Sequence, residues 1–329
     1  MPSCVAYTCP NVRNVTLHGS QCIQQINDVF YVQPCGHGYV CDQRSEKCTF
    51  PPSALPESSF AYVNEPCTYS MDCKFGTCKD GYCRGAEENA VCTEDDDCEV
   101  GLYCYQRRNC KKQSNAPTCF NDEDCLNGFG CNITDIATNT GLCVSYYSIN
   151  PGRTVGFCDS DWSQQRLCSS GTCLRIGEGR GTCTAPVKTN GTLPLSCEGD
   201  DECVSTEWPA NSGQRMQGKC QCGYDDVPAS YCTLFPGDPI PTQLRDQAKK
   251  WYKSEAITHC NTAQRHSTRC MELWWSPVDY ATFMYLQAKT ADYTAIHYNS
   301  VCTKLVFTQA YWSAHSLYLN ARSFLSLTS

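Results

Sequence analysis

Cysteine content and spacing constrain this chain more than any other feature of its sequence. The 329 residues include 30 cysteines, and proteins of the reducing cytosol rarely keep so many. An even count fits complete pairing into disulfides, although connectivity cannot be read from spacing alone. We therefore expect an exported, disulfide-stabilised protein, built from several small folding units because the chain is long for one disulfide scaffold.

Four-cysteine segments repeat along residues 61–240. Each has two cysteines five to nine residues apart, a short gap that contains a glycine, and two further cysteines. The first to fifth segments are predicted as Cys67, Cys73, Cys78, Cys83; Cys92, Cys98, Cys104, Cys110; Cys119, Cys125, Cys131, Cys143; Cys158, Cys168, Cys173, Cys183; and Cys197, Cys203, Cys220, Cys222, with Cys232 trailing and the glycine step lost. An atypical set, Cys22, Cys35, Cys41 and Cys48, precedes them.

Segments this short cannot bury enough apolar surface to offset chain entropy. Closing a loop of about 15 residues with a disulfide is worth about 3 kcal/mol, so two crosslinks per segment can compensate. We expect interlaced pairing, first cysteine to third and second to fourth, which would give short two-stranded hairpins. The glycine between the second and third cysteines is expected to adopt a positive φ.

An acidic residue stands directly before the second cysteine in four segments. These residues are Asp72, Asp97, Asp124 and Glu202. Calcium binding is one interpretation, but calcium loops such as the EF-hand alternate their ligands and add a later glutamate. Acids in a tight turn more often accept backbone N–H bonds or face water, and we favour that interpretation.

The sequence CTEDDDCEVGLYCYQRRNCKKQSNAPTCFNDEDCLNGFGC resembles the cysteine-rich region of the Dickkopf N-terminal type. The resemblance covers roughly residues 67–145 and, more loosely, 158–232, and it overlaps in appearance with EGF-like modules. It includes an aromatic residue before the third cysteine, here Tyr103. The second, colipase-like half of animal Dickkopf proteins has no counterpart in this chain, so the resemblance implies a scaffold and no role as a Wnt antagonist.

The chain changes character near residue 240. All 22 glycines lie at or before Gly237, and Pro277 is the one proline after Pro241. Thr242 and Ser276 are predicted helix N-caps, the second followed by proline at the first helical position. The fold class we predict is therefore small disulfide-rich tandem modules, with short β-hairpins and loops, followed by an α-helical C-terminal domain. The predicted domains are residues 1–60, 61–240 and 241–329.

Aromatic residues are dense in the predicted helical domain. They either pack against the cysteine-rich part, form an aromatic core, or make a protein interface, where Trp and Tyr are over-represented. The candidate interface residues are Trp251, Trp274, Trp275, Tyr311 and Trp312. Three cysteines, Cys260, Cys270 and Cys302, lie in this domain. One of them must pair upstream, pair with another chain, or stay free.

Few residues suggest chemistry. His259, Cys260, His266 and Cys270 have side chains that zinc accepts, but a Cys260–Cys270 disulfide explains the cysteines more simply. The chain has no G-x-S-x-G, H-E-x-x-H or phosphate-binding glycine loop. We therefore predict no catalytic residues, no metal, no cofactor and no enzyme activity.

Three sequons, at Asn14, Asn132 and Asn190, are candidate N-glycosylation sites. No apolar run of 18 residues predicts a membrane span, and the first residues lack the features of a signal peptide, so we expect a mature extracellular chain. The net charge of −8 argues against nucleic acid as a partner.

Residues 241–329 carry +4, which leaves −12 for residues 1–240. Two parts of opposite charge suit head-to-tail contacts between copies. The predicted function is a structural subunit of an extracellular filament, appendage or coat that self-associates. The alternative is a secreted or cell-surface binding or adhesion module, such as a receptor ectodomain or a ligand.

Overall fold

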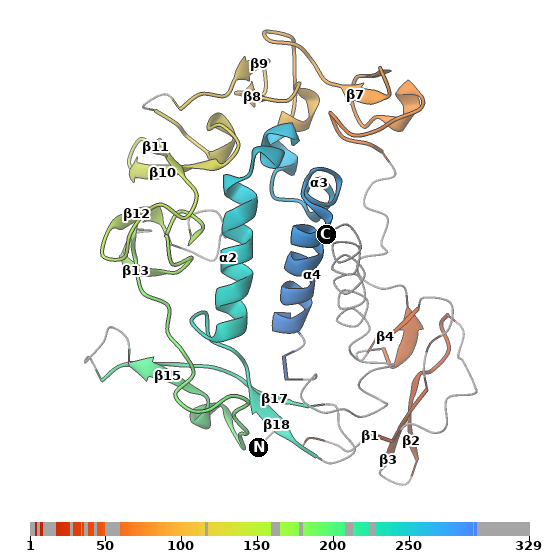
Figure 1. Ribbon diagram of the computed structural model, residues 1–329, viewed down its shortest axis with the longest axis vertical. Helices are drawn as coiled ribbons and strands as arrows, with labels where there is room; N and C mark the ends of the chain where they lie inside the picture. The colour runs from red at the N-terminus through yellow and green to blue at the C-terminus, as the bar shows by residue number, and fades with distance from the viewer. Residues whose placement is uncertain are drawn as a thin grey trace, which may run out of the picture. The chain divides into compact units, whose positions relative to one another are not determined.

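The computed structural model describes residues 4, 7–8, 18–26, 29–33, 35, 39–42, 45–49, 60–115, 118–158, 165–177, 180–207, 213–223, 228–291 and 293–294. The protein is disulfide-rich, with many short antiparallel strand pairs and a few helices towards the C-terminus (Figure 1). The chain divides into two compact units. Unit 1 contains Met1–Glu57, Val187–Leu244 and Ala281–Ser329, and unit 2 contains Ser58–Pro186 and Arg245–Tyr280. The units are thus not consecutive stretches like the predicted domains.

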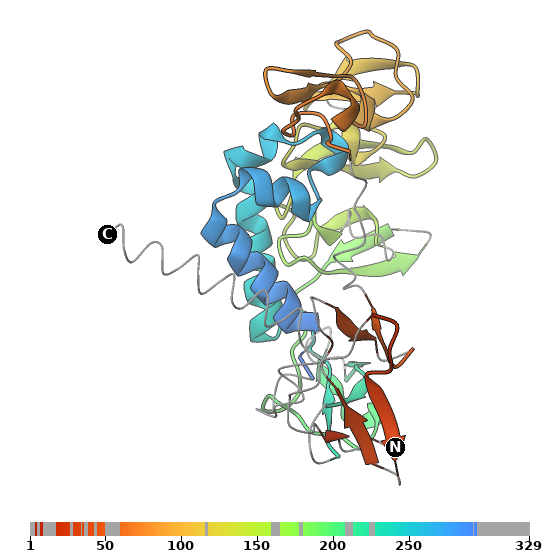
Figure 2. The same cartoon turned by 90° about the vertical axis from the view of Figure 1, so that its right-hand side faces the viewer.

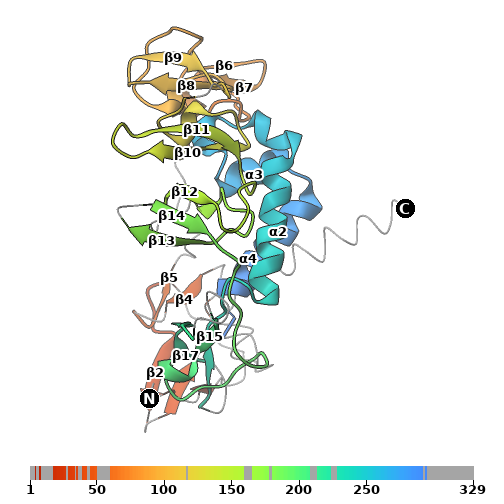
Figure 3. The same ribbon diagram turned by 90° about the vertical axis from the view of Figure 1, so that its left-hand side faces the viewer.

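Unit 2 contains the first four four-cysteine segments, and each of them forms an antiparallel strand pair. The pairs are β6 (Thr77–Lys79) with β7 (Tyr82–Arg84), β8 (Leu102–Tyr105) with β9 (Asn109–Lys112), β10 (Phe129–Asp135) with β11 (Thr140–Ser145), and β13 (Cys173–Gly177) with β14 (Arg180–Cys183), which also pairs with β12 (Thr154–Phe157). Within unit 2 these strand pairs follow one another along the helices (Figure 3).

Disulfides in these segments follow one interlaced pattern. The bonds are Cys67–Cys78 and Cys73–Cys83, Cys92–Cys104 and Cys98–Cys110, Cys119–Cys131 and Cys125–Cys143, and Cys158–Cys173 and Cys168–Cys183. The third and fourth cysteines of each segment are partners in the strand register, as Cys104 and Cys110 are. Each strand of a hairpin is therefore tied separately to the loop that precedes it. This is the pairing that we expected, first cysteine to third and second to fourth.

Unit 1 contains the atypical set and the fifth segment. Its antiparallel pairs are β2 (Ile23–Ile26) with β3 (Val29–Val32), β4 (Val40–Asp42) with β5 (Lys47–Thr49), β15 (Val204–Glu207) with β16 (Arg215–Gln217), and β17 (Cys220–Cys222) with β18 (Ser230–Cys232), while β1 (Tyr7–Thr8) pairs with β3 in parallel. The atypical set is also interlaced, with Cys22–Cys41 and Cys35–Cys48 bonds.

The membership predicted for the fifth segment is wrong at one position. Cys197 bonds Cys220 and Cys203 bonds Cys232, so Cys232 is the fourth cysteine. Cys222, which the spacing placed there, bonds Cys4 instead. The strand register explains the difference, because Cys232 lies opposite Cys220 across the ladder, whereas Cys222 is on the same strand as Cys220.

Glycine has the predicted backbone role in the first four segments. Gly76, Gly101, Gly128 and Gly171, which lie between the second and third cysteines, have φ of 76°, 80°, 89° and 67°. At Gly76 a Cβ atom would lie 1.8 Å from the Arg84 carbonyl oxygen, which no side chain can accommodate. Glycine therefore permits both the turn and the close approach of the hairpin.

Three α-helices occur among the described residues, with two short 3₁₀ helices between the first and second. They are α2 (Pro239–Lys253), η6 (Glu255–His259), η7 (Thr262–Gln264), α3 (Thr268–Trp274) and α4 (Pro277–Ala291). α4 begins as predicted after Ser276. The start predicted for the first helix is wrong, because Pro239 is already at its first position and the Thr242 N–H donates to the Asp238 carbonyl, 3.0 Å away.

Candidate functional site: the acidic turns and the seam with the helical stretch

The acid before the second cysteine caps a short turn. The turns are η2 (Ser70–Asp72), η3 (Asp95–Asp97), η4 (Asp122–Asp124) and η5 (Asp200–Glu202). Asp97 Oδ2 accepts the N–H groups of Thr93 and Glu94 at 2.7 and 3.1 Å. Asp72, Asp124 and Glu202 accept backbone N–H groups at the corresponding positions. These carboxylates therefore bind the backbone, which is the interpretation that the sequence favoured over calcium.

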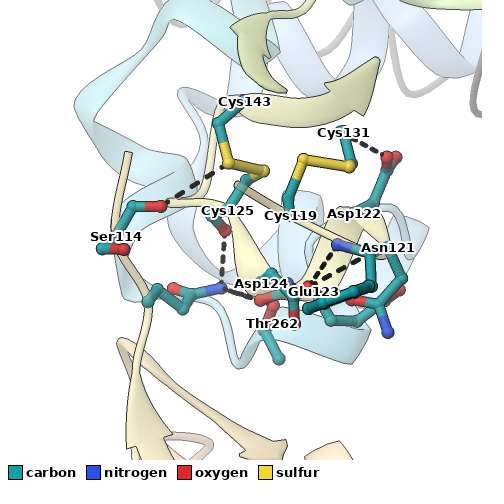
Figure 4. Close-up of a disulfide and its surroundings, with 12 residues drawn as sticks. Ser114, Cys119, Asn121, Asp122, Glu123, Asp124, Cys125, Cys131, Cys143 and Thr262 are labelled. Atoms are coloured by element: carbon teal, nitrogen blue, oxygen red, sulfur yellow. Dashed lines mark hydrogen bonds between the residues drawn. A yellow bond between two sulfur atoms is a disulfide. The ribbon is translucent and has the colours of Figure 1, made fainter. Parts of the chain in front are cut away.

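A second side chain in each turn binds the third cysteine, and sequence reasoning missed it. The residue three before the second cysteine accepts the backbone N–H of the third cysteine at 2.7–3.1 Å. The pairs are Ser70 with Cys78, Asp95 with Cys104, Asp122 with Cys131 and Asp200 with Cys220. Figure 4 shows the contact for Asp122 and Cys131 beside both disulfides of the third segment. The recurrence of Ser or Asp at this position was the signal that could have revealed it.

The same carboxylate position titrates differently in different segments because its surroundings differ. Hydrogen bonds from the Tyr69 and Thr68 backbone N–H groups lower the pKa of the Asp72 carboxyl. Burial raises the pKa of Asp124 in spite of equivalent bonds. Burial also raises the pKa of Glu123 and of Asp95. Contacts with neighbouring groups in unit 2 therefore set the protonation of these turns more than the repeated motif does.

Polar contacts join residues 245–280, here called the helical stretch, to each of the first four segments or to the chain beside them. We call this set of contacts the seam. Asn64 Nδ2 donates to His259 O (2.9 Å), Asn261 Nδ2 to Cys98 O (3.0 Å), Arg265 Nη1 to Cys125 O (3.2 Å), Asn127 Nδ2 to Ile257 O and Cys260 O (2.9 and 2.8 Å), and Arg245 Nη1 to Ser170 O (3.0 Å). The helical stretch lies on one side of the cysteine-rich segments in unit 2 (Figure 2). It therefore acts as their common support.

Arg265 lies at the centre of the seam and is fully buried, with 0% of its surface exposed. Its carbonyl oxygen accepts the Trp251 indole N–H at 2.9 Å. Its Nη2 atom has no hydrogen-bond partner among the described residues. A buried guanidinium is stable only near compensating charge, and the carboxylates of Asp95 and Glu123 interact electrostatically with it.

His266 joins two tyrosines in the same region. Its Nδ1 atom lies 2.9 Å from the Tyr252 hydroxyl, and its Nε2 atom lies 3.4 Å from the Tyr146 hydroxyl. Tyr146 in turn donates to Asp122 Oδ2 at 2.7 Å. Burial, followed by the Arg166 and Arg265 charges, holds the pKa of His266 well below its usual range. His266 is therefore a neutral hydrogen-bonding group at the seam.

The structure places the predicted interface residues in different surroundings. Trp251 and Trp275 are 0% and 7% exposed, with ring centroids 5.4 Å apart, so the prediction that they face a partner is wrong. Both are buried because the helical stretch folds around them. Trp274 is half-buried and stacks on Tyr82 and His259, with centroids 6.4 and 4.7 Å away. Tyr311 and Trp312 lie outside the described residues.

The alternative of a zinc site at His259, Cys260, His266 and Cys270 lacks its thiolate ligands, because Cys260 and Cys270 form a disulfide. Elsewhere in the described chain, five sets of three cysteine Sγ atoms lie within 4.8 Å of one another. All of them belong to interlaced disulfides, and metal binding needs a free thiolate. Figure 4 shows such a set in the third segment. The described residues contain no free cysteine.

The sequons differ in accessibility. Asn190 is exposed. Asn132 is half-buried in β10, and its Oδ1 atom accepts the Gly156 N–H at 3.0 Å. Asn14 lies outside the described residues. Asn190 therefore meets the steric requirement of a glycan best.

Fold and site together define a disulfide-rich protein whose small segments are fastened to a helical support. No family model, curated protein or solved structure matches this chain. Within the residues that the structure describes, no helix has both the length and the apolar character needed to span a membrane.

Proposed function

We propose that this chain is a non-enzymatic structural subunit of an extracellular assembly, such as a filament, appendage or coat, and that it assembles by self-association. The observation that carries the proposal is the seam: polar contacts fix the first four segments, or the chain beside them, to one helical stretch. Such fixing, added to two disulfides per segment, gives a stiff body. Stiffness suits a building block better than an enzyme that must open and close.

The proposal also covers how the segments are related to one another and where the protein is located. The four-cysteine segments are tandem copies of one module, of the type that the Dickkopf N-terminal region resembles. Their shared interlaced disulfides and shared turn contacts support this. Fourteen disulfides among the described residues support secretion, since thiols in the cytosol stay reduced. A glycan at Asn190 is part of the proposal.

Three groups that could have supplied chemistry are engaged in structure. The Cys260 and Cys270 thiols are consumed in a disulfide, and His266 is held between two tyrosine hydroxyls. These contacts support a non-enzymatic role. The opposite charges of residues 1–240 and 241–329 support head-to-tail association, acting mainly at contact because physiological salt screens charges over about 8 Å.

The test is the state of the secreted, full-length protein over a concentration series. Sedimentation velocity should show growing oligomers, and negative-stain micrographs should show regular assemblies. Reversing two exposed charges of α2, Lys250→Glu with Lys253→Glu, should weaken association at low salt. Lys188→Glu, on an exposed residue of the acidic part, is the matched control and should not.

A monodisperse monomer at high concentration would contradict the proposal that this chain is a self-associating structural subunit. The second candidate function, a secreted or cell-surface binding or adhesion module, would then remain. Trp274 favours that candidate, because a half-buried indole stacked on Tyr82 and on the exposed His259 resembles the aromatic anchors of binding surfaces.

A further inference from the structure

The β8–β9 hairpin of the second segment is locally basic in an acidic protein. Residues 106–112 contain Arg107, Arg108, Lys111 and Lys112 and no acid, whereas the whole chain has a net charge of −8. Arg107 and Arg108 are exposed at the turn between the strands. A cluster of cations on a short exposed element is typical of sites for polyanions.

One face of this hairpin combines the cations with aromatic rings. Tyr103 lies opposite Lys111 in the strand register, and Tyr105 lies opposite Asn109, so these four side chains share a face. The two tyrosine rings meet edge to face at 6.3 Å, and Lys111 Nζ lies 3.5 Å from the Tyr105 ring centroid. Lys112 belongs to the other face and pairs with Glu88 at 3.1 Å.

The turn itself is not optimised for stability. Gln106 and Arg107 have φ of 51° and 55°, in the left-handed region that most side chains avoid. The corresponding turn of the β6–β7 hairpin uses Asp80 and Gly81, with φ of 55° and 80°. Asp-Gly is the preferred sequence for this turn geometry. The β8–β9 connection is longer, with three residues (106–108) between the paired Tyr105 and Asn109. Gln106 and Arg107 nevertheless occupy two positive-φ positions that favour Gly, Asn or Asp, which indicates that their long side chains serve a purpose other than the turn.

The acids nearest this face, Asp95 and Asp124, interact electrostatically with Tyr103, at the end of the face away from the turn. Asp95 and Asp97 accept backbone N–H groups, and Asp96 pairs with Lys74 at 2.8 Å. These carboxylates lie in η3, before the hairpin, and hold the segment together. Within the part of the chain that the structure describes, no ion pair joins Arg107 or Arg108 to a carboxylate, so their exposed side chains are available to an external anion.

From this arrangement we infer that the β8–β9 face binds an acidic polysaccharide. Arg107, Arg108 and Lys111 would hold its sulfate or carboxylate groups by charge-assisted hydrogen bonds. A sugar ring would lie against the side of the Tyr105 ring opposite Lys111, whose Nζ atom lies 3.5 Å from the ring centroid. The inference goes beyond the proposed function and does not depend on self-assembly.

The test uses the full-length secreted protein and two probes, heparin and polygalacturonate, with neutral dextran as the negative control. Arg107→Ser with Arg108→Ser should weaken binding to at least one acidic probe by about tenfold, as expected for the loss of two exposed ionic contacts. Arg153→Ser with Arg180→Ser removes two exposed arginines near another hairpin of unit 2 and should leave binding unchanged. Peptide mapping of the disulfides shows that each variant is folded.

A second variant separates binding from folding. Gln106→Asn with Arg107→Gly gives the turn its preferred residues, so the midpoint of thermal unfolding should rise by about 2–4 °C while polysaccharide binding falls. Retention of full binding by this variant and by the double serine variant would overturn the inference. So would a loss of self-association in the arginine variants with unchanged polysaccharide binding, since the face would then contact a second copy.

Discussion

At the residue scale, each turn before a second cysteine uses two side chains for two different backbone segments. One carboxylate caps the turn itself, as Asp97 does, and the side chain two residues earlier holds the third cysteine's N–H, as Asp95 does. The acid-rich sequence of these turns therefore has a structural cause. The two carboxylates hold the turn before the second cysteine and the N–H of the third cysteine, and both of these cysteines form the disulfides of the segment.

Replacing Asp97 by alanine should destabilise the second segment by about 1–2 kcal/mol, because two backbone N–H groups lose their acceptor. Hydrogen exchange at the Thr93 and Glu94 amides should accelerate. Glu87→Ala, at an exposed position, is the control and should change neither rate. Stabilisation of the native protein by calcium, lost in the Asp97 variant, would contradict this account.

His266 should make stability depend on pH. Its native pKa lies below the value of about 6.5 expected in the unfolded chain. The unfolded state therefore takes up a proton first as the pH falls, and the stability that His266 contributes above pH 6.5 is lost below it, by up to about 1.4 kcal/mol per pH unit. The quantity to measure is the difference in unfolding free energy between the protein and His266→Gln at pH 8, 6 and 5.

That difference should shrink on acidification. The comparison also cancels the opposite contribution of the half-buried acids Asp95 and Glu123, whose raised pKa values favour folding as the pH falls. A pH-independent difference for His266→Gln would show that its role is only steric.

Asn190 should carry an N-glycan in secreted material, and Asn132 should carry less or none. Asn190 is exposed, whereas the Asn132 amide is half-buried and already hydrogen-bonded to Gly156. Mass spectrometry of tryptic glycopeptides measures the occupancy of both sites directly. Asn190→Gln should lower the mass of the intact protein by one glycan, and an equal occupancy at Asn132 would contradict the ranking.

At the element scale, side chains of the helical stretch bind backbone carbonyl groups of the cysteine-rich segments, and side chains of those segments bind backbone carbonyl groups of the helical stretch. Asn127, from the third segment, donates to the carbonyl groups of Ile257 and Cys260 at the end of η6. Asn261, directly after η6, donates to the carbonyl group of Cys98 at the end of η3. The carbonyl groups of Cys260 and Cys98, which directly follow these short turns, therefore receive side-chain donors from another element.

Alanine at Asn127 or at Asn261 should cost about 1–3 kcal/mol, since each change removes the side-chain donor to the carbonyl group of a buried residue, Cys260 or Cys98. The measurement is local: hydrogen exchange should accelerate in η6 for Asn127→Ala and in both η3 and η7 for Asn261→Ala. Asn115→Ala, at an exposed position between the second and third segments, should have no effect. Exchange unaffected by both seam variants would show that the seam contributes no rigidity.

Helix boundaries show how far local signals can predict this structure. Ser276 and Pro277 predict the start of α4 correctly, because the N-cap is formed by residues next to the start of the helix. The start of α2 is different, since Asp238 also accepts the Thr189 N–H and hydroxyl groups at 2.8 and 2.7 Å, from a strand-bearing region far away in sequence. A contact with a residue so distant in sequence cannot be predicted from the residues next to the helix.

At the scale of the whole molecule, the disulfides among the described residues account for 28 of the 30 cysteines. The fourteen bonds involve every cysteine except Cys9 and Cys302, both of which lie outside the described residues. We expect these two to bond each other, which would tie the C-terminal stretch to the N-terminal one. Non-reducing peptide mapping should recover a Cys9–Cys302 crosslinked peptide and no free thiol. A covalent dimer through either cysteine would contradict this expectation and point to an intermolecular bond.

The sequence by itself determined the disulfide-rich class, and it correctly predicted the membership, the glycine turns and the interlaced pairing of the first four segments, because each of these depends on residues fewer than about 30 positions apart. Only the tertiary structure decided that Cys222 bonds Cys4, that Trp251 and Trp275 are buried, and that Asn127, Asn261 and Arg265 fasten the segments to a helical support. These contacts join residues up to 218 positions apart. Local spacing carries no information about them, because they depend on which surfaces meet after each segment has folded.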